Sequence, residues 1–230
     1  MTPRSGGGTK ILIGSLTYLP TASPGGLSML DGLIEAIDHR DRYTRRHCED
    51  VARYAVYLAA RDGADAELCA AAQAAALVHD VGKIAVADDV LRKPAPLTAA
   101  EEQVMQQHVV LGGILVRDVA NDTLIAEGVE YHHERWDGSG YAIGLAGEAI
   151  PLIARIVAVA DAFSAMTTSR PYRAGIDERE ALKRLAEVAG TQLDPRLTSL
   201  FVEAMRDDPE APRPSDPRKP SFWLPNSEAA

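Results

Sequence analysis

The residues with the clearest chemical potential in this sequence are histidines and aspartates at the edges of apolar helical segments. His79 and Asp80 directly follow the apolar run 70–78, so the pair should lie at the border of a core. His132 and His133 are adjacent and precede a glycine-rich loop. Since neighbouring residues on a helix point about 100° apart, two such imidazoles can reach two metals, or one metal and a bound ligand. The alternatives are a hydrogen-bonded core histidine for His79 and a polar helix end for His132–His133.

Asp161 is the sharpest of these observations. It lies within the segment 151–163, which is apolar over most of a helical circumference and should be buried. An ionised carboxylate in such a place costs several kcal/mol unless it is paired or bound to a metal. Arg155 stands six residues earlier, which is not a neighbour spacing on a helix. The partner must therefore come from elsewhere: a metal ion, or as the alternative a distant Arg or Lys.

Two more histidines extend this set of candidate ligands. His47 should face inward on an amphipathic helix, and His108 precedes Gly112–Gly113, which permit close packing. Nitrogen and oxygen ligands without thiolate suit Mn, Fe, Zn or Ni. The candidates exceed the ligands of one tetrahedral zinc, whereas a two-metal cluster accommodates them. Asp80, with two carboxylate oxygens, can bridge such a cluster.

Composition limits the function classes. The chain has 230 residues, enough for one well-cored domain, and with 46% hydrophobic and 25% charged residues it has the composition of a soluble globular protein. A net charge of -9 excludes a broad basic surface for a DNA or RNA polymer. No apolar run approaches the roughly 20 residues of a membrane helix. We find no secretory signal, and we expect a cytoplasmic protein that does not bind membranes.

The elements that must position the candidate ligands are helices. Thr98 with Glu101 forms a capping-box pattern, and Asp194 before Pro195 marks another helix start. Two long stretches, 81–97 and 135–150, are expected to be non-helical, and loops of this length are often functional. The expected helices cover residues 28–39, 44–62, 65–79, 98–106, 108–119, 122–133, 151–168, 177–188 and 195–205.

Both ends of the chain differ from this helical middle. Residues 1–10 and 20–27 are rich in Gly, Pro, Ser and Thr, and we expect an N-terminal extension over residues 1–27. Residues 206–230 combine prolines with charges and few apolar residues, which predicts a flexible tail without a core of its own. The sequence therefore predicts an all-α protein with a single compact domain over residues 28–205.

Several short motifs follow one another along this domain. They include His79-Asp80-Val81-Gly82-Lys83, the run 132–141 from His132-His133 to Gly140-Tyr141, and Arg170-Pro171-Tyr172-Arg173, together with residues 36–47, 93–98, 108–112 and 155–161. In this order they resemble the HD-GYP domain, a branch of the HD phosphohydrolase superfamily. The resemblance spans residues 28–205. It implies an all-helical, metal-dependent phosphodiesterase that hydrolyses cyclic di-GMP to linear pGpG or GMP.

The resemblance also assigns roles to residues. Asp80 and Lys83 would be catalytic, Lys83 by contacting phosphate, and Arg170 and Arg173 match a basic pair near the nucleotide. In the loop 135–150, Arg135 and Tyr141 are candidate substrate contacts, with packing or solvated surface as the alternative. Two divalent transition-metal ions are implied, Fe or Mn, with Zn or Ni as alternatives. The implied metal ligands are His47, His79, Asp80, His108, His132, His133 and Asp161.

The sequence departs from the family pattern at a few positions. Ala142 replaces the proline of the Gly-Tyr-Pro triad, which frees φ and adds an N–H. Ser164 stands where an acidic residue is common, Val109 replaces a proline, and Tyr43 stands where three-metal members have Glu, which implies two metals here. These departures keep two alternatives open: a silent cyclic di-GMP receptor or protein-interaction module, and an HD-type hydrolase of another nucleotide. A homodimer or a signalling-protein partner is a further expectation.

Overall fold

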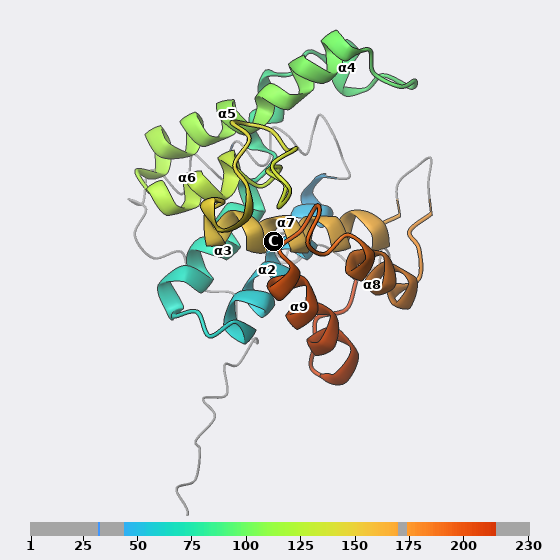
Figure 1. The fold of residues 1–230 in the computed structure, drawn as a ribbon. Coiled ribbons are helices and arrows are strands. Elements are labelled where there is room, and N and C mark those ends of the chain that lie inside the picture. The colour runs from blue at the N-terminus through green and yellow to red at the C-terminus, as the bar shows by residue number, and fades with distance from the viewer. Residues whose placement is uncertain (1–31, 33–43, 170–173, 215–230) are drawn as a thin grey trace, which may run out of the picture.

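The computed structural model of the protein describes residues 32, 44–169 and 174–214. Within these segments the secondary structure is helical, and the only β-type pairing is an isolated bridge between Ala189 and Leu193. The all-α prediction is confirmed. In chain order (Figure 1) the elements are α2 (Thr44–Arg61), α3 (Ala66–Val78), η1 (Val81–Ala85), α4 (Asp88–Leu91), α5 (Ala99–Ala120), α6 (Thr123–Glu130), η2 (Gly147–Ala149), α7 (Leu152–Thr167), α8 (Glu178–Glu187) and α9 (Pro195–Asp207).

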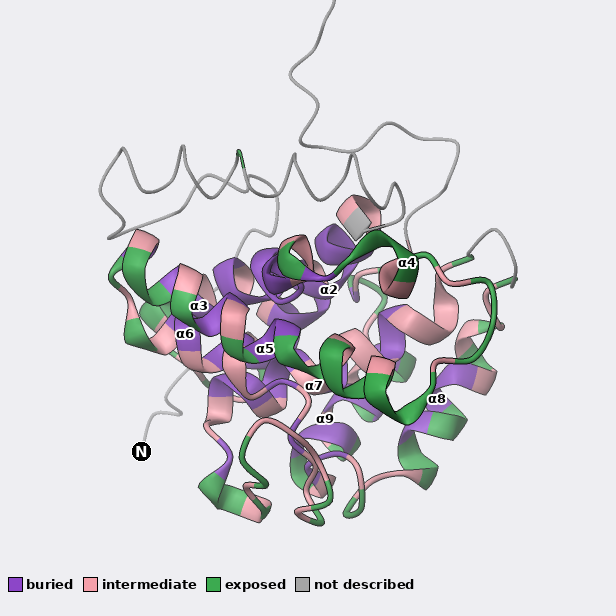
Figure 2. Ribbon diagram, turned by 90° about the horizontal axis from the view of Figure 1, so that it is seen from above, coloured by how far each residue is buried: buried purple, intermediate pink, exposed green. Residues whose placement is uncertain are grey.

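Helix α7 is the central element of the bundle. It crosses the middle of the molecule and contacts α2, α3, α6, α8 and α9 (Figure 1). Its sequence explains this position, because apolar residues occur all around it and most of them are buried. Phe163 packs edge-on against Tyr54 of α2 and Phe201 of α9, with ring centroids 5.0 and 5.2 Å apart. Figure 2 shows the buried residues gathered in the middle of the bundle, with exposed residues on its outer turns.

Three of the predicted helix starts are confirmed by their capping contacts. The Asp65 carboxylate accepts a hydrogen bond from the N–H of Leu68 at 2.9 Å at the start of α3. Thr98 and Glu101 form the reciprocal capping box of α5. Asp194 accepts from two N–H groups at the start of α9, where Pro195 is the first helical residue. These contacts satisfy backbone donors that the helix itself leaves unpaired.

The predicted break in the helical region 98–119 is wrong. Helix α5 runs without interruption from Ala99 to Ala120, so His108 lies in the middle of a helix. The reason is local, because Gln106, Gln107 and Val109 include no helix breaker and Val109 keeps the N–H that a proline would lack. The stretch 81–97 was also predicted to be non-helical, but it contains the short helices η1 and α4.

Packing continues past residue 205, where the sequence analysis placed the end of the domain. Helix α9 runs to Asp207, and Ala211 is buried in the core with 5% of its surface exposed. Arg213 donates to the carbonyl oxygen of Met205 at 3.3 Å and pairs with Glu178. The expected helix 28–39 (apart from residue 32), Tyr43, Arg170, Arg173 and residues 215–230 lie outside the described residues. Across the described segments, no helix is long and apolar enough to cross a membrane.

Candidate metal centre

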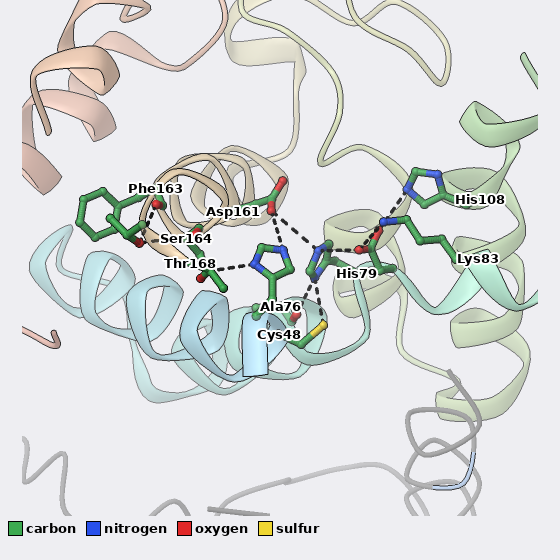
Figure 3. A network of polar contacts seen from close by, with 12 residues as sticks. Cys48, Ala76, His79, Lys83, His108, Asp161, Phe163, Ser164 and Thr168 are labelled. Carbon is green, nitrogen blue, oxygen red and sulfur yellow. Dashed lines mark hydrogen bonds and ion pairs between the residues drawn. The ribbon is translucent and has the colours of Figure 1, made fainter. Parts of the chain in front are cut away.

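All the predicted metal ligands belong to the described residues, and they converge from separate helical elements. His47 lies in the first turn of α2, His79 caps the end of α3, and Asp80 precedes η1. His108 comes from the middle of α5, His132 and His133 from the turn after α6, and Asp161 from α7. Figure 3 shows Asp161, His79 and His108 pointing toward a common region between their helices.

The ligand atoms form two groups. Those of His108, His132 and His133 lie within 4.8 Å of one another, and so do those of His47, His79 and Asp80.

Asp80 connects these two groups through its two carboxylate oxygens. Oδ2 lies 3.4 Å from Nε2 of His79, and Oδ1 lies 3.4 Å from Nε2 of His108. The Asp161 carboxylate contacts two histidines of the second group. Its Oδ1 lies 3.0 Å from Nε2 of His47 and 4.0 Å from Nε2 of His79. The Asp80 carboxylate thus lies between the two groups and could be shared by them.

Three of the imidazoles are oriented by carbonyl groups of their own helical segments. Nδ1 lies 2.7 Å from the carbonyl oxygen three residues earlier in each case: Ala76 for His79, Met105 for His108 and Val129 for His132. In the neutral imidazole, an Nδ1–H that donates to this carbonyl leaves Nε2 unprotonated and facing the centre. The Nε2 atoms of His108 and His132 are buried without a hydrogen-bond partner among the described residues. Buried polar atoms are rarely left unpaired, so these residues fit a metal ion.

Burial favours the neutral form of His108, His132 and His133. It lowers the pKa of His132 and His133, and it lowers the pKa of His108 to about 4. A neutral imidazole is the form that binds a metal. Burial alone would raise the pKa of Asp80, but the charges of Lys83 and His79 hold it well below its usual range. The ammonium of Lys83 lies 2.6 Å from Oδ2 of Asp80, which keeps this carboxylate ionised.

The fourth oriented imidazole, that of His47, depends on a side chain far away in the sequence. Its Nδ1 lies 2.9 Å from Oγ of Ser164, a fully buried residue of α7. Ser164 in turn lies 3.4 Å from the hydroxyl of Thr168 (Figure 3). The departure noted in the sequence therefore falls on a residue whose hydroxyl lies beside His47, one of the predicted metal ligands.

Replacing Ser164 with alanine is expected to weaken metal binding by about 10- to 100-fold, because His47 loses the hydroxyl that fixes its ring. Metal affinity would be measured by competition with a chelator of known affinity. Ser199→Ala, at an exposed position of α9, is the matched control. An affinity of Ser164→Ala equal to that of the control would show that Ser164 does not orient His47.

The predicted substrate contacts differ in their surroundings. Tyr141 packs against His133, with ring centroids 5.0 Å apart, and so lies next to the metal centre. Arg135 is engaged within its own loop, with Nη2 2.9 Å from Asp137 Oδ2 and Nε 2.8 Å from Ser139 Oγ. The roles of Lys83, Arg135 and Tyr141 toward a substrate stay predictions, as do those of Arg170 and Arg173.

One functional candidate was missed by the sequence analysis. Glu134 is buried, and its Oε1 accepts hydrogen bonds from the N–H groups of Ala142, Ile143 and Gly144 at 3.3, 2.8 and 3.0 Å. The available signal was its position directly after the His132-His133 pair. The sequence alone gave no sign that residues 142–144 turn back onto it.

The site can be compared with known proteins. A profile of the family described as HD domain matches residues 31–197. A protein of Xanthomonas campestris pv. campestris, named cyclic di-GMP phosphodiesterase response regulator RpfG, is 43% identical over 178 residues, which cover 75% of this chain and 46% of that protein. A protein of Vibrio cholerae, named 3'3'-cGAMP-specific phosphodiesterase 1, is 34% identical over 171 residues, covering 74% of this chain and 40% of that protein.

The fold has a counterpart among solved structures. A V. cholerae structure titled as a cyclic GMP-AMP specific phosphodiesterase superposes with a TM-score of 0.60 at 18% identity, covering 79% of this chain and 48% of that one. At this identity the likeness concerns the fold. The chain spans less than half the length of the curated relatives described above, which are covered over 46% and 40% of their lengths.

Proposed function

This chain belongs to the HD domain family, and we propose that it is a metal-dependent phosphodiesterase that hydrolyses cyclic di-GMP. The observation that carries the proposal is the complete ligand set, in which the Asp80 carboxylate contacts His79 on one side and His108 on the other. The buried Nε2 atom of His132, which has no hydrogen-bond partner among the described residues, supports the same conclusion. The substrate is suggested by the curated relative that is named a cyclic di-GMP phosphodiesterase.

We propose two divalent transition-metal ions, Fe or Mn, with Zn or Ni as alternatives, because the ligands are nitrogen and oxygen atoms. His108, His132 and His133 would hold one ion, and His47, His79 and Asp161 the other, with Asp80 shared. Bound there, such ions would supply Lewis acidity that lowers the pKa of a water molecule and polarises a phosphodiester.

The protein's own side chains contribute charge and position. Burial alone would lower the pKa of Lys83, but the charge of Asp80 raises it, so the side chain stays an ammonium at neutral pH. Held beside Asp80, this ammonium can offset negative charge that develops on a phosphate during the reaction. Tyr141, packed on His133, lies where a base of the nucleotide could stack. In-line attack of a water oxygen on the phosphorus would break the bond to the ribose 3′ oxygen, which would leave as a hydroxyl after taking up a proton. The product would be linear pGpG, or GMP after a second hydrolysis.

Metal binding at pH 7 is expected to release about one proton from His79. Although burial opposes the charged imidazolium, the charge of Asp80 raises the pKa of His79 well above its usual value. The metal-free protein therefore carries this proton below the raised pKa, and a metal must displace it. Below the raised pKa of His79, the metal affinity should therefore fall by about tenfold for each unit by which the pH drops. Titration calorimetry in two buffers of different ionisation enthalpy measures the release; equal heats in both buffers would contradict it.

The proposed function is tested by supplying cyclic di-GMP to the purified protein with Mn, or with Fe(II) under anaerobic conditions. We expect about two metal ions per chain and a linear product. The same assay with 3'3'-cGAMP, ppGpp and deoxynucleoside triphosphates separates the other substrates of this class of enzyme. Bound cyclic di-GMP without product would favour the silent receptor. Protein that stays metal-free under all conditions would overturn the two-metal site. A cytoplasmic location, a homodimer and a signalling-protein partner stay predictions.

A further inference from the structure

Glu134 is a buried carboxylate whose environment is built by one short loop. Its side chain follows the His132-His133 pair directly, and only 3% of the residue surface is exposed. Oε1 accepts from three consecutive N–H groups, those of Ala142, Ile143 and Gly144. Gly144 has a φ of +78°, in the left-handed region. Consecutive N–H groups turned toward one point in this way form a concavity that binds an anion.

The same loop is joined to the metal centre at a second place. The N–H of Tyr141 donates to the carbonyl oxygen of His133 at 3.3 Å, and the two rings lie 5.0 Å apart. Gly140 allows this close approach, because a Cβ there would lie 2.4 Å from the nitrogen of Arg135 and 2.7 Å from Cα of Glu134. Residues 140–144, here called the Tyr141 loop, are therefore fixed on one side by Glu134 and on the other by His133.

We propose that Glu134 is a positioning residue: its carboxylate fixes the Tyr141 loop, and through Tyr141 and the backbone of His133 it holds the substrate side of the metal centre in place. The inference rests on the proposed function. The hydrogen bonds of Glu134 Oε1 go to backbone N–H groups of this loop, so Glu134 acts through its neighbours. Ala142 strengthens the arrangement in this chain, because a proline at this position would have no N–H to donate to Oε1.

The test compares Glu134→Ala with Glu134→Gln, and uses Glu148→Gln, an exposed carboxylate of η2 in the same loop region, as the matched control. Without Glu134, amide hydrogen exchange at residues 142–144 should speed up by about tenfold or more. The kcat for cyclic di-GMP should fall by about 10²-fold, because misplacement near the reacting groups costs that much. Metal content should stay that of the wild type.

The conservative variant Glu134→Gln tests whether the side chain acts by accepting hydrogen bonds from the loop. Glu134→Gln keeps a carbonyl oxygen for the three N–H groups, so it should retain most of the exchange protection and most of the kcat. Ala142→Pro removes one donor and should speed exchange at 143 and 144 by less than Glu134→Ala does. The proposal would be supported if Glu134→Gln kept most of the kcat and the exchange protection, and if Ala142→Pro speeded exchange by less than Glu134→Ala.

Several results would overturn the inference. Turnover of Glu134→Ala equal to that of Glu148→Gln would do so, whether or not the loop exchanges faster. Loss of metal in Glu134→Ala would also do so, because Glu134 would then act on the metal site itself. Failure of the proposed function appears differently, as absent turnover in the wild type and in Glu148→Gln, and it removes the reaction on which the inference rests.

Discussion

Replacing Asp80 with alanine is expected to abolish metal retention and to lower cyclic di-GMP cleavage by about 10³-fold or more. The carboxylate contacts His79 through one oxygen and His108 through the other, so its removal takes the shared ligand from both groups. Lys83 would also lose the partner that lies 2.6 Å from its ammonium. Metal content by elemental analysis and product formation by chromatography measure the two effects.

The matched control for this variant is Asp89→Ala, at an exposed position of α4 only a few residues away. It should keep the metal content and the activity of the wild type. The helical circular dichroism of Asp80→Ala must also match the wild type, so that loss of metal is not loss of fold. An Asp80→Ala protein that is folded and retains about two metals would refute the bridging role.

Replacing Gly82 with alanine is expected to have the largest effect on stability, about 3 kcal/mol or more, because the added atom meets backbone. A Cβ at this position would lie 1.9 Å from the carbonyl oxygen of His108 and 2.6 Å from the nitrogen of Gly112. Neither group can move without displacing α5. The metal centre should suffer as well, because Asp80 and His108 would be pushed apart. Chemical denaturation and metal content measure the two consequences.

A second glycine offers the comparison. Gly63 has nothing within 4 Å of an added Cβ, but its φ of +85° makes alanine unfavourable there. Gly63→Ala should therefore cost only about 1 kcal/mol, from backbone conformation alone. If Gly82→Ala lowered the free energy of unfolding by no more than Gly63→Ala, the close approach of η1 and α5 would not be a rigid contact.

Much of the fold could be predicted because its signals are local. Caps such as Asp65 and the Thr98–Glu101 box mark helix starts within a few residues, and the apolar circumference of α7 marks a buried helix. The uninterrupted α5 was missed because His108 was taken as a helix start, although the residues beside it include no helix breaker. The packing of α5 against η1, by contrast, is a tertiary contact that no local signal marks.

In the candidate metal centre, too, the sequence indicated candidate residues but not the tertiary contacts that position them. Asp161 was predicted to need a partner from elsewhere in the chain, and the structure places its carboxylate beside His47 and His79. Arg155 pairs with Asp194 instead, at 2.6 Å. The sequence did not reveal which residues position the predicted ligands through contacts between distant segments. Ser164 contacts His47 across 117 positions, and Glu134 contacts a loop whose return path no periodicity indicates.

The imidazoles of the candidate metal centre also differ in how far along the chain their orienting partners lie. His79, His108 and His132 each use a carbonyl three residues earlier, so a single turn of backbone is enough to aim them. Each of these rings therefore finds the carbonyl that orients it within its own local turn. His47 is aimed by Ser164, and its ring is fixed only when α2 docks on α7. The rings of His79, His108 and His132 are therefore oriented by local backbone, whereas the orientation of His47 depends on a long-range contact.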